Sequence, residues 1–311
     1  MKNKVGKSRS CGILKFMQIK VDELVAHGRL GTASTYKSTL KSFSNFLDGK
    51  DVRIGRVDAS LMERYEAWLQ GRNLVRNTTS FYLRTLRTIY KQALDMGMTD
   101  GVDIFRHVYT GFDRTPKRAV SLQDIRAIRD INLNGNRVME FARDMFMFSF
   151  YMRGMPFVDM AYLKKSDLIG DRVVYFRKKT KQRLEVSWEP QMQEIIDKYV
   201  DVTEGRPYML PIITSDDIPE RQQYLRAERS VNRNLKRIAN ILKMNIPLTT
   251  YVARHTWASS AYRLNIPISV ISECMGHDSE KTTQIYLASL DNATISMANR
   301  RILDKISYSR T

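Results

Sequence analysis

Apolar side chains recur along the first hundred residues at the three- and four-residue spacing of one side of a helix. Four such segments follow one another. Each has an inward aromatic or aliphatic position, represented in chain order by Phe16, Phe43, Tyr65 and Leu86. Asp58 and Asn77 stand where the third and fourth segments begin, as helix caps would. Because each stripe must be buried against the others, residues 12–105 are predicted to form an all-helical domain.

The pattern changes after Ala119. Ser121 precedes an amphipathic helical segment, and residues 137–151 form a strongly apolar one. Residues 172–188 alternate instead and are rich in Val, Tyr and Phe, which predicts a β-hairpin with its bend near Thr180–Lys181. The expected fold class is therefore mainly α with a small antiparallel β-sheet, the second domain being mixed α+β.

A stretch without apolar periodicity separates the two patterns. Residues 106–118 contain Gly111, Pro116 and several charges, and they are predicted to be the interdomain linker. Two domains suit a chain of 311 residues. Residues 1–11 are predicted to be a basic leader, and residues 119–311 the second domain, with a tail helix over residues 291–306.

The charge of the chain indicates its partner. Fifty-one Lys and Arg against 33 Asp and Glu give a formal charge of +18, which favours nucleic acid. Arg84, Arg87 and Lys91 share one helix face, which is either an ordinary solvated face or a surface that follows DNA phosphates. Further basic candidates for DNA contact lie on the hairpin and on a long helix over residues 221–244: Lys178, Lys181, Arg229 and Arg233.

The sequence gives little indication of a membrane protein, a secreted protein or a bound cofactor. No apolar run approaches the length of a membrane span. Cys11 and Cys274 are far apart, so a cytoplasmic protein with reduced thiols and no zinc is expected. No cluster of carboxylates suggests a divalent metal, and no cofactor is expected.

Residues 251–286 carry the candidate chemistry. Arg254, His277 and Tyr286 follow one another there, with Gly276 placed to end a helix just before the histidine. An arginine can fork onto the non-bridging oxygens of a phosphate diester, and an imidazole can add a hydrogen bond. A tyrosine can supply the attacking oxygen.

These residues resemble the catalytic motifs of the tyrosine site-specific recombinases, the phage integrase family. The family has H-x-x-R-H-T, then L-G-H, then the nucleophilic tyrosine nine residues on. Here Arg254-His255-Thr256, Met275-Gly276-His277 and Tyr286 stand at that spacing, and Lys179-Thr180 matches the lysine motif of its hairpin. The resemblance implies an N-terminal SAM-like core-binding domain, and a catalytic domain that cleaves DNA through a 3′-phosphotyrosine without ATP or metal.

Two departures mark a variant of the kind found in mobile-element integrases and invertases. Aligned on Gly154, the family's first catalytic arginine is replaced by Pro156. Arg153 and Arg177 are the candidate replacements. We favour Arg177 because alternation along a strand would place it beside Lys179.

The second departure is Tyr251, where the family has histidine. One helical turn separates it from Arg254, so the two share a helix face and Tyr251 can be a donor that positions the phosphate. The alternative is a core tyrosine. Both departures leave an alternative function open, a recombinase-derived DNA-binding protein that no longer cuts. A type IB topoisomerase, which shares the chemistry but acts as a monomer without partner sites, is a third and weaker alternative.

The resemblance also implies partners. These are double-stranded DNA and further copies of the chain, as a dimer on one site and a tetramer in the synapse. Accessory DNA-bending proteins are compatible with the same reading.

Overall fold

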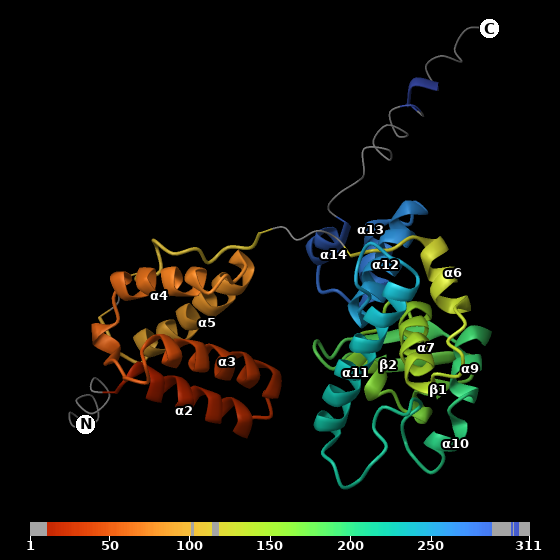
Figure 1. The fold of residues 1–311 in the computed structure, drawn as a ribbon, viewed down its shortest axis with the longest axis horizontal. Helices are drawn as coiled ribbons and strands as arrows, with labels where there is room; N and C mark the ends of the chain where they lie inside the picture. The colour runs from red at the N-terminus through yellow and green to blue at the C-terminus, as the bar shows by residue number, and fades with distance from the viewer. Residues whose placement is uncertain (1–10, 101–102, 114–117, 288–299, 301, 305–311) are drawn as a thin grey trace. The chain divides into compact units, whose positions relative to one another are not determined.

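The chain folds as two units, residues 1–115 and 116–311, which are shown in Figure 1. The computed structural model describes residues 11–100, 103–113, 118–287, 300 and 302–304. The predicted leader lies almost wholly outside these residues, and so does most of the predicted tail helix.

The regular elements in the described part of unit 1 are helices. Its α-helices are α2 (Ile13–Ala26), α3 (Leu30–Phe46), α4 (Ala59–Gly71) and α5 (Arg76–Asp95), with a short 3-10 turn at Ile54–Arg56. The apolar stripes meet in one core, where Phe43 and Tyr65 are fully buried with ring centroids 4.9 Å apart. Asp58 caps α4 as predicted, accepting a bond from the Leu61 amide at 2.8 Å.

The prediction for Asn77 is wrong, because α5 begins at Arg76 with Val75 as its N-cap residue. The Asn77 side chain instead holds the backbone of Asp113, donating to its carbonyl at 3.0 Å and accepting from its amide at 2.8 Å. Ser80, one turn further along α5, donates to the carbonyl of Gly111 at 2.6 Å. Residues 109–113, which we call the strap, are therefore hydrogen-bonded to α5. The sequence had predicted them to be part of the linker.

Replacing Asn77 by alanine is expected to release the end of the strap. Both hydrogen bonds to Asp113 would be lost, each contributing about 1 kcal/mol. Amide exchange at Asp113 should then rise by about tenfold or more when measured by hydrogen–deuterium exchange. Lys91→Ala, an exposed position on the same helix, is the control. Unchanged exchange at Asp113 in the Asn77 variant would contradict the role of this side chain.

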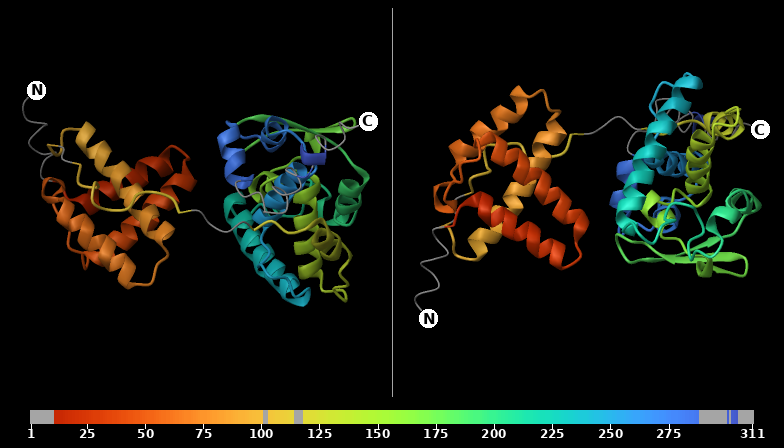
Figure 2. Two further views of the ribbon diagram at one scale, coloured as in Figure 1. Left: turned by 90° about the horizontal axis from the view of Figure 1, so that it is seen from above. Right: turned by 60° about the horizontal axis from the view of Figure 1, so that its bottom comes forward.

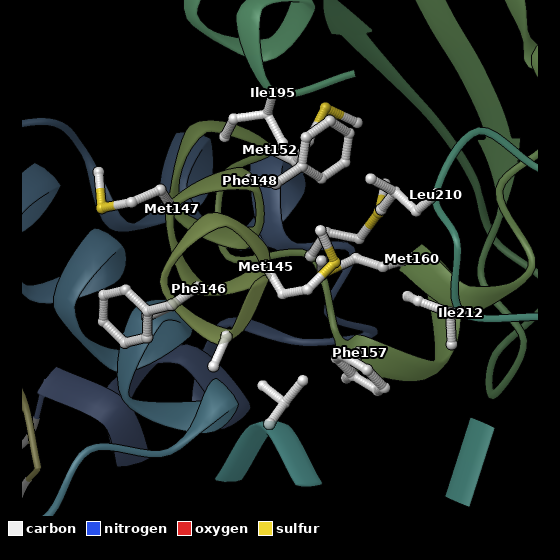
Figure 3. Close-up of a cluster of buried hydrophobic side chains, with 14 of the residues drawn as sticks. Met145, Phe146, Met147, Phe148, Met152, Phe157, Met160, Ile195, Leu210 and Ile212 are labelled. Atoms are coloured by element: carbon white, nitrogen blue, oxygen red, sulfur yellow. The ribbon is translucent and has the colours of Figure 1, made fainter. Parts of the chain in front are cut away.

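The core of unit 2 is built around one apolar helix. Helix α7 (Arg137–Tyr151) packs against α11 (Glu220–Ile241) and α12 (Thr250–Arg263). Met145, Phe146 and Phe148 of α7 are fully buried in the cluster drawn in Figure 3. The long helix and the motif-bearing helix are thus fixed to a common support.

A three-stranded antiparallel sheet lies along one side of unit 2, as Figure 2 shows in green. Its strands are β1 (Leu168–Ile169), β2 (Arg172–Phe176) and β3 (Arg183–Ser187). Val173 pairs with Val186, and Tyr175 with Leu184, so these four inward side chains are buried together. The hairpin prediction is confirmed, with the turn over residues 177–182.

Short elements complete unit 2. They are α6 (Leu122–Asp130), α8 (Phe157–Ala161), the 3-10 turn Lys165–Asp167, α9 (Pro190–Asp197), α10 (Val200–Thr203), α13 (Ile268–Met275) and α14 (Glu280–Leu287). Ser121 caps α6 in a capping box with Asp124, as its position in the sequence predicted. Across the described part of the chain, no helix is both long and apolar enough to cross a membrane.

Candidate active site

Arg254 forms the centre of the candidate site. Its side chain leaves α12 into the interior and is only 4% exposed. The guanidinium donates to the carbonyls of Gly154 at 2.8 Å and Met275 at 2.6 Å, and Nη2 lies 2.9 Å from His277 Nε2. Gly154 has φ +75°, and a Cβ there would stand 2.6 Å from the Arg254 Cα. Only glycine therefore allows this approach.

Arg177 reaches the same place from the hairpin. It is 7% exposed, and its Nη1 donates to the carbonyls of Met275, at 3.3 Å, and Gly276. The two guanidinium groups thus meet at the Met275 carbonyl oxygen. These contacts join segments about a hundred positions apart in the chain.

The prediction that strand alternation places Arg177 beside Lys179 is wrong. Strand β2 ends at Phe176, so alternation no longer applies beyond it. Arg177 is buried, whereas Lys179 lies exposed in the turn. Lys179 is still close enough to the site for its positive charge to help lower the pKa of His277.

Asp159 fixes the end of the hairpin. Its carboxylate, in α8, is 4% exposed, lies 3.5 Å from Arg177 Nε and accepts a bond from the Lys178 amide at 2.8 Å. Burial raises the pKa of Asp159, and the Lys178 amide and the Arg177 charge oppose that rise. A carboxylate inside the apolar run FVDMAYL was the signal of a buried ion pair.

His277 follows Gly276, which ends α13 in the left-handed conformation at φ 61°, as predicted. Its Nδ1 lies 2.8 Å from the hydroxyl of Thr283, a fully buried residue of α14. Because an arginine can only donate, Nε2 accepts from Arg254 and Nδ1–H donates to Thr283. Burial, followed by the charges of Arg254, Arg177 and Lys179, lowers the pKa of His277 to about 4. The imidazole is therefore neutral at pH 7.

An NMR titration of the free protein is expected to give His277 a midpoint near pH 4 rather than near 6.5. The unfolded chain binds the proton at higher pH than the folded chain does. The contribution of neutral His277 to the free energy of unfolding is thus fully present above pH 6.5. It is lost as the pH falls towards 4. His277→Asn should remove this part of the pH dependence of thermal unfolding. A midpoint at the ordinary histidine value would contradict the burial of the ring beside these cations.

Tyr286 lies in α14, and its side chain is outside the described residues. Its backbone is one helical turn beyond Thr283, the residue that contacts His277. Helix α14 packs against α12, which carries Arg254, and against α13, which ends just before His277. The three motifs predicted from the sequence therefore belong to one group of helices.

The remaining candidates differ in their surroundings. Tyr251 is 52% exposed, so the alternative of a core tyrosine is wrong. The centroids of the Tyr251 and His255 rings lie 4.7 Å apart. Arg153 donates to the Glu185 carbonyl at 3.2 Å and lies 3.8 Å from the Cys274 sulfur. These contacts direct Arg153 towards β3.

The basic face predicted on α5 is covered by the chain itself at Arg84. The Arg84 guanidinium stacks on the ring of Phe112, 3.4 Å from its centroid, and burial lowers its pKa. Arg87 lies 3.4 Å from the Thr110 hydroxyl. Arg87 and Lys91 are exposed, whereas Arg84 is partly buried under Phe112.

The other DNA-contact candidates lie in unit 2. Lys181, Arg229 and Arg233 are exposed, and the Lys178 ammonium stands 3.7 Å from the ring centroid of Tyr162. Among the residues that the structure describes, no three His, Cys, Asp or Glu side chains gather as a metal site would require.

Comparison with known proteins adds sequence relatives. Residues 13–103 match the family model described as phage integrase SAM-like domain, and residues 128–293 match the one described as phage integrase family. Tyrosine recombinase XerC of Rickettsia prowazekii is 23% identical over 270 residues, covering 82% of this chain and 85% of the relative. Tyrosine recombinase XerD of Rickettsia bellii is 21% identical over 297 residues, covering 88% and 93%.

Solved structures share the fold. The Tn1549 transposon integrase in complex with a circular intermediate DNA matches at TM-score 0.66 and 13% identity, over 92% of this chain and 99% of that one. A lambda integrase tetramer bound to a Holliday junction matches at TM-score 0.68 and 13% identity, over 89% and 78%. The predicted fold class is thereby confirmed.

Proposed function

This chain belongs to the phage integrase family and is a site-specific DNA recombinase, and from that premise we propose that it cuts and rejoins DNA through Tyr286. Residues 12–105 would bind DNA, and residues 119–311 would hold the chemistry. The product of cleavage would be a 3′-phosphotyrosine with a free 5′-hydroxyl.

The observation that carries this proposal is the meeting of two buried guanidinium groups beside a neutral imidazole. Arg254 and Arg177 share the Met275 carbonyl, and Arg254 also bonds His277. A pentacoordinate phosphate carries charge on two non-bridging oxygens, and fixed cations in a water-poor site stabilise that charge strongly. Arg177 would thus replace the arginine that the family has where this chain has Pro156.

The proposed reaction balances without an added oxidant, nucleotide or metal. The Tyr286 oxygen attacks phosphorus and passes its proton to solvent water, while the bond from phosphorus to the 5′ oxygen breaks. Lys179 gives a proton to the leaving oxygen, because an alkoxide is a poor leaving group. The new phosphotyrosine ester retains the energy of the diester, so the 5′-hydroxyl of a partner strand can attack it and reseal the DNA.

Assembly is proposed from the relatives. Lambda integrase has been solved as a dimer bound to a core site and as a tetramer bound to a Holliday junction. We propose the same states for this chain on its own sites, with double-stranded DNA as substrate. The use of accessory DNA-bending proteins stays a prediction.

A suicide DNA substrate with a nick next to the cleavage point tests the reaction. The short strand diffuses away after cleavage and traps the covalent adduct, which mass spectrometry of the digested protein should map to Tyr286. Sequencing of the trapped DNA gives the cleavage point. DNA binding at a proven site without any adduct would instead favour a non-cutting DNA-binding protein, the alternative suggested by Pro156.

A further inference from the structure

A hollow of about 300 Å³ opens beside Arg254. It lies between the start of α8, one side of α11 and the start of α12, and its principal lining residues are Pro156, Tyr224, Glu228, Asn232, Tyr251 and Arg254. The volume is enough for a group of the size of a nucleobase with part of its sugar. Pro156, which stands in place of a long arginine side chain, forms part of the wall.

The wall from α11 is a single stripe. Tyr224, Glu228 and Asn232 follow one another at four-residue spacing, so they face the same side of the helix. The ring of Tyr224 lies 6.2 Å from that of Tyr162, on which the Lys178 ammonium rests. The hollow is thus connected through packed side chains to the hairpin as well as to Arg254.

Glu228 is the acceptor in this wall that the protein leaves unused. Asn232 already accepts a bond from the Thr250 amide at 2.9 Å and so fixes the start of α12. Glu228 is partly buried, and it makes neither a hydrogen bond nor an ion pair with any residue in the described part of the chain. Burial raises the pKa of Glu228, and the neighbouring Arg229 charge opposes that rise. A partly buried carboxyl group without a hydrogen-bond donor is stabilised when a ligand brings one.

We propose that the hollow receives one nucleotide adjoining the scissile phosphate, and that Glu228 selects a base with an amino group on its major-groove edge, cytosine or adenine. The inference rests on the proposed function, because Arg254 can bring DNA here only if it binds the phosphate. A nucleotide next to that phosphate lies within reach of the hollow, and tyrosine rings provide faces for a base or sugar. On the major-groove edge, cytosine and adenine present amino groups that a glutamate can accept from, whereas guanine and thymine present keto oxygens, which are acceptors themselves.

The test uses a duplex library randomised at three positions on each side of the cleavage point mapped with the wild-type protein. Covalent adducts are trapped and sequenced for the wild type, for Glu228→Gln and for Glu194→Gln, an exposed glutamate of α9 outside the hollow. The wild type should enrich cytosine or adenine about tenfold at one flanking position. Glu228→Gln should reduce that preference to about twofold or less, because an amide both donates and accepts. Preferences at the other positions should be retained, and Glu194→Gln should match the wild type.

The outcomes separate the two proposals. Adducts from the wild type without amino-base enrichment, or an unchanged preference in Glu228→Gln, would overturn the nucleotide hollow alone. If the wild type forms no adduct with bound DNA, the cleavage reaction fails and the hollow loses its premise. Thermal unfolding of Glu228→Gln checks the fold, and Tyr224→Leu provides a second variant. It should lower adduct yield several-fold on every base, and an unchanged yield would also count against the hollow.

Discussion

Tyr286→Phe is expected to abolish covalent adduct formation on the suicide substrate while DNA binding persists. The change removes one oxygen, and that oxygen is the proposed nucleophile. Loss of a nucleophile can reduce turnover on the order of 10⁶-fold, as in a serine protease. The measurement is adduct yield by gel electrophoresis under denaturing conditions, with binding followed in parallel by mobility shift.

Tyr262→Phe is the matched control, because it removes a phenolic oxygen from a partly buried tyrosine of the same unit. This variant should form adducts like the wild type. An adduct that survives in Tyr286→Phe would move the nucleophile to another residue and would remove the basis of the proposed reaction.

Arg177→Ala is expected to slow DNA cleavage by about 10²–10³-fold with DNA binding nearly intact. The loss follows from removing one of the two cations that we propose to face the developing charge. Binding depends on many phosphate contacts, so a single buried arginine contributes little to it. Single-turnover cleavage and mobility shift measure the two quantities separately.

The same substitution leaves Asp159 without its partner. A buried carboxylate that loses its cation costs about 3–5 kcal/mol, so Arg177→Ala alone is expected to lower the thermal stability of unit 2. The double variant Arg177→Ala with Asp159→Asn removes the unpaired charge. It should recover stability but not cleavage, which separates an effect on folding from an effect on chemistry.

Arg177→Lys provides a further distinction. Lysine keeps the positive charge but loses the planar guanidinium, whose Nη1 donates to both Met275 and Gly276. Cleavage is expected to be partly retained. Near-normal cleavage in Arg177→Ala would contradict the assignment and transfer the role to Arg153, which Arg153→Ala would then test.

Local signals in the sequence were sufficient for the elements of the fold. Apolar spacing located the helices of unit 1, and alternation located the hairpin. Asp58, Ser121 and Gly276 cap helices where their positions indicated. These features depend on neighbours within a few positions, so a single sequence contains them. The Asn77 prediction failed because its side chain bonds to Asp113, far along the chain.

The sequence by itself determined the two-part helical architecture, the hairpin, and the order of Arg254, His277 and Tyr286. Only the tertiary structure decided how the side chains are used. It buries Arg177 against Met275 and Asp159, and it covers Arg84 with the strap. The physical reason is that periodicity fixes which side of an element faces inward. Which distant carbonyl or carboxylate a cation then meets depends on contacts between segments about a hundred residues apart.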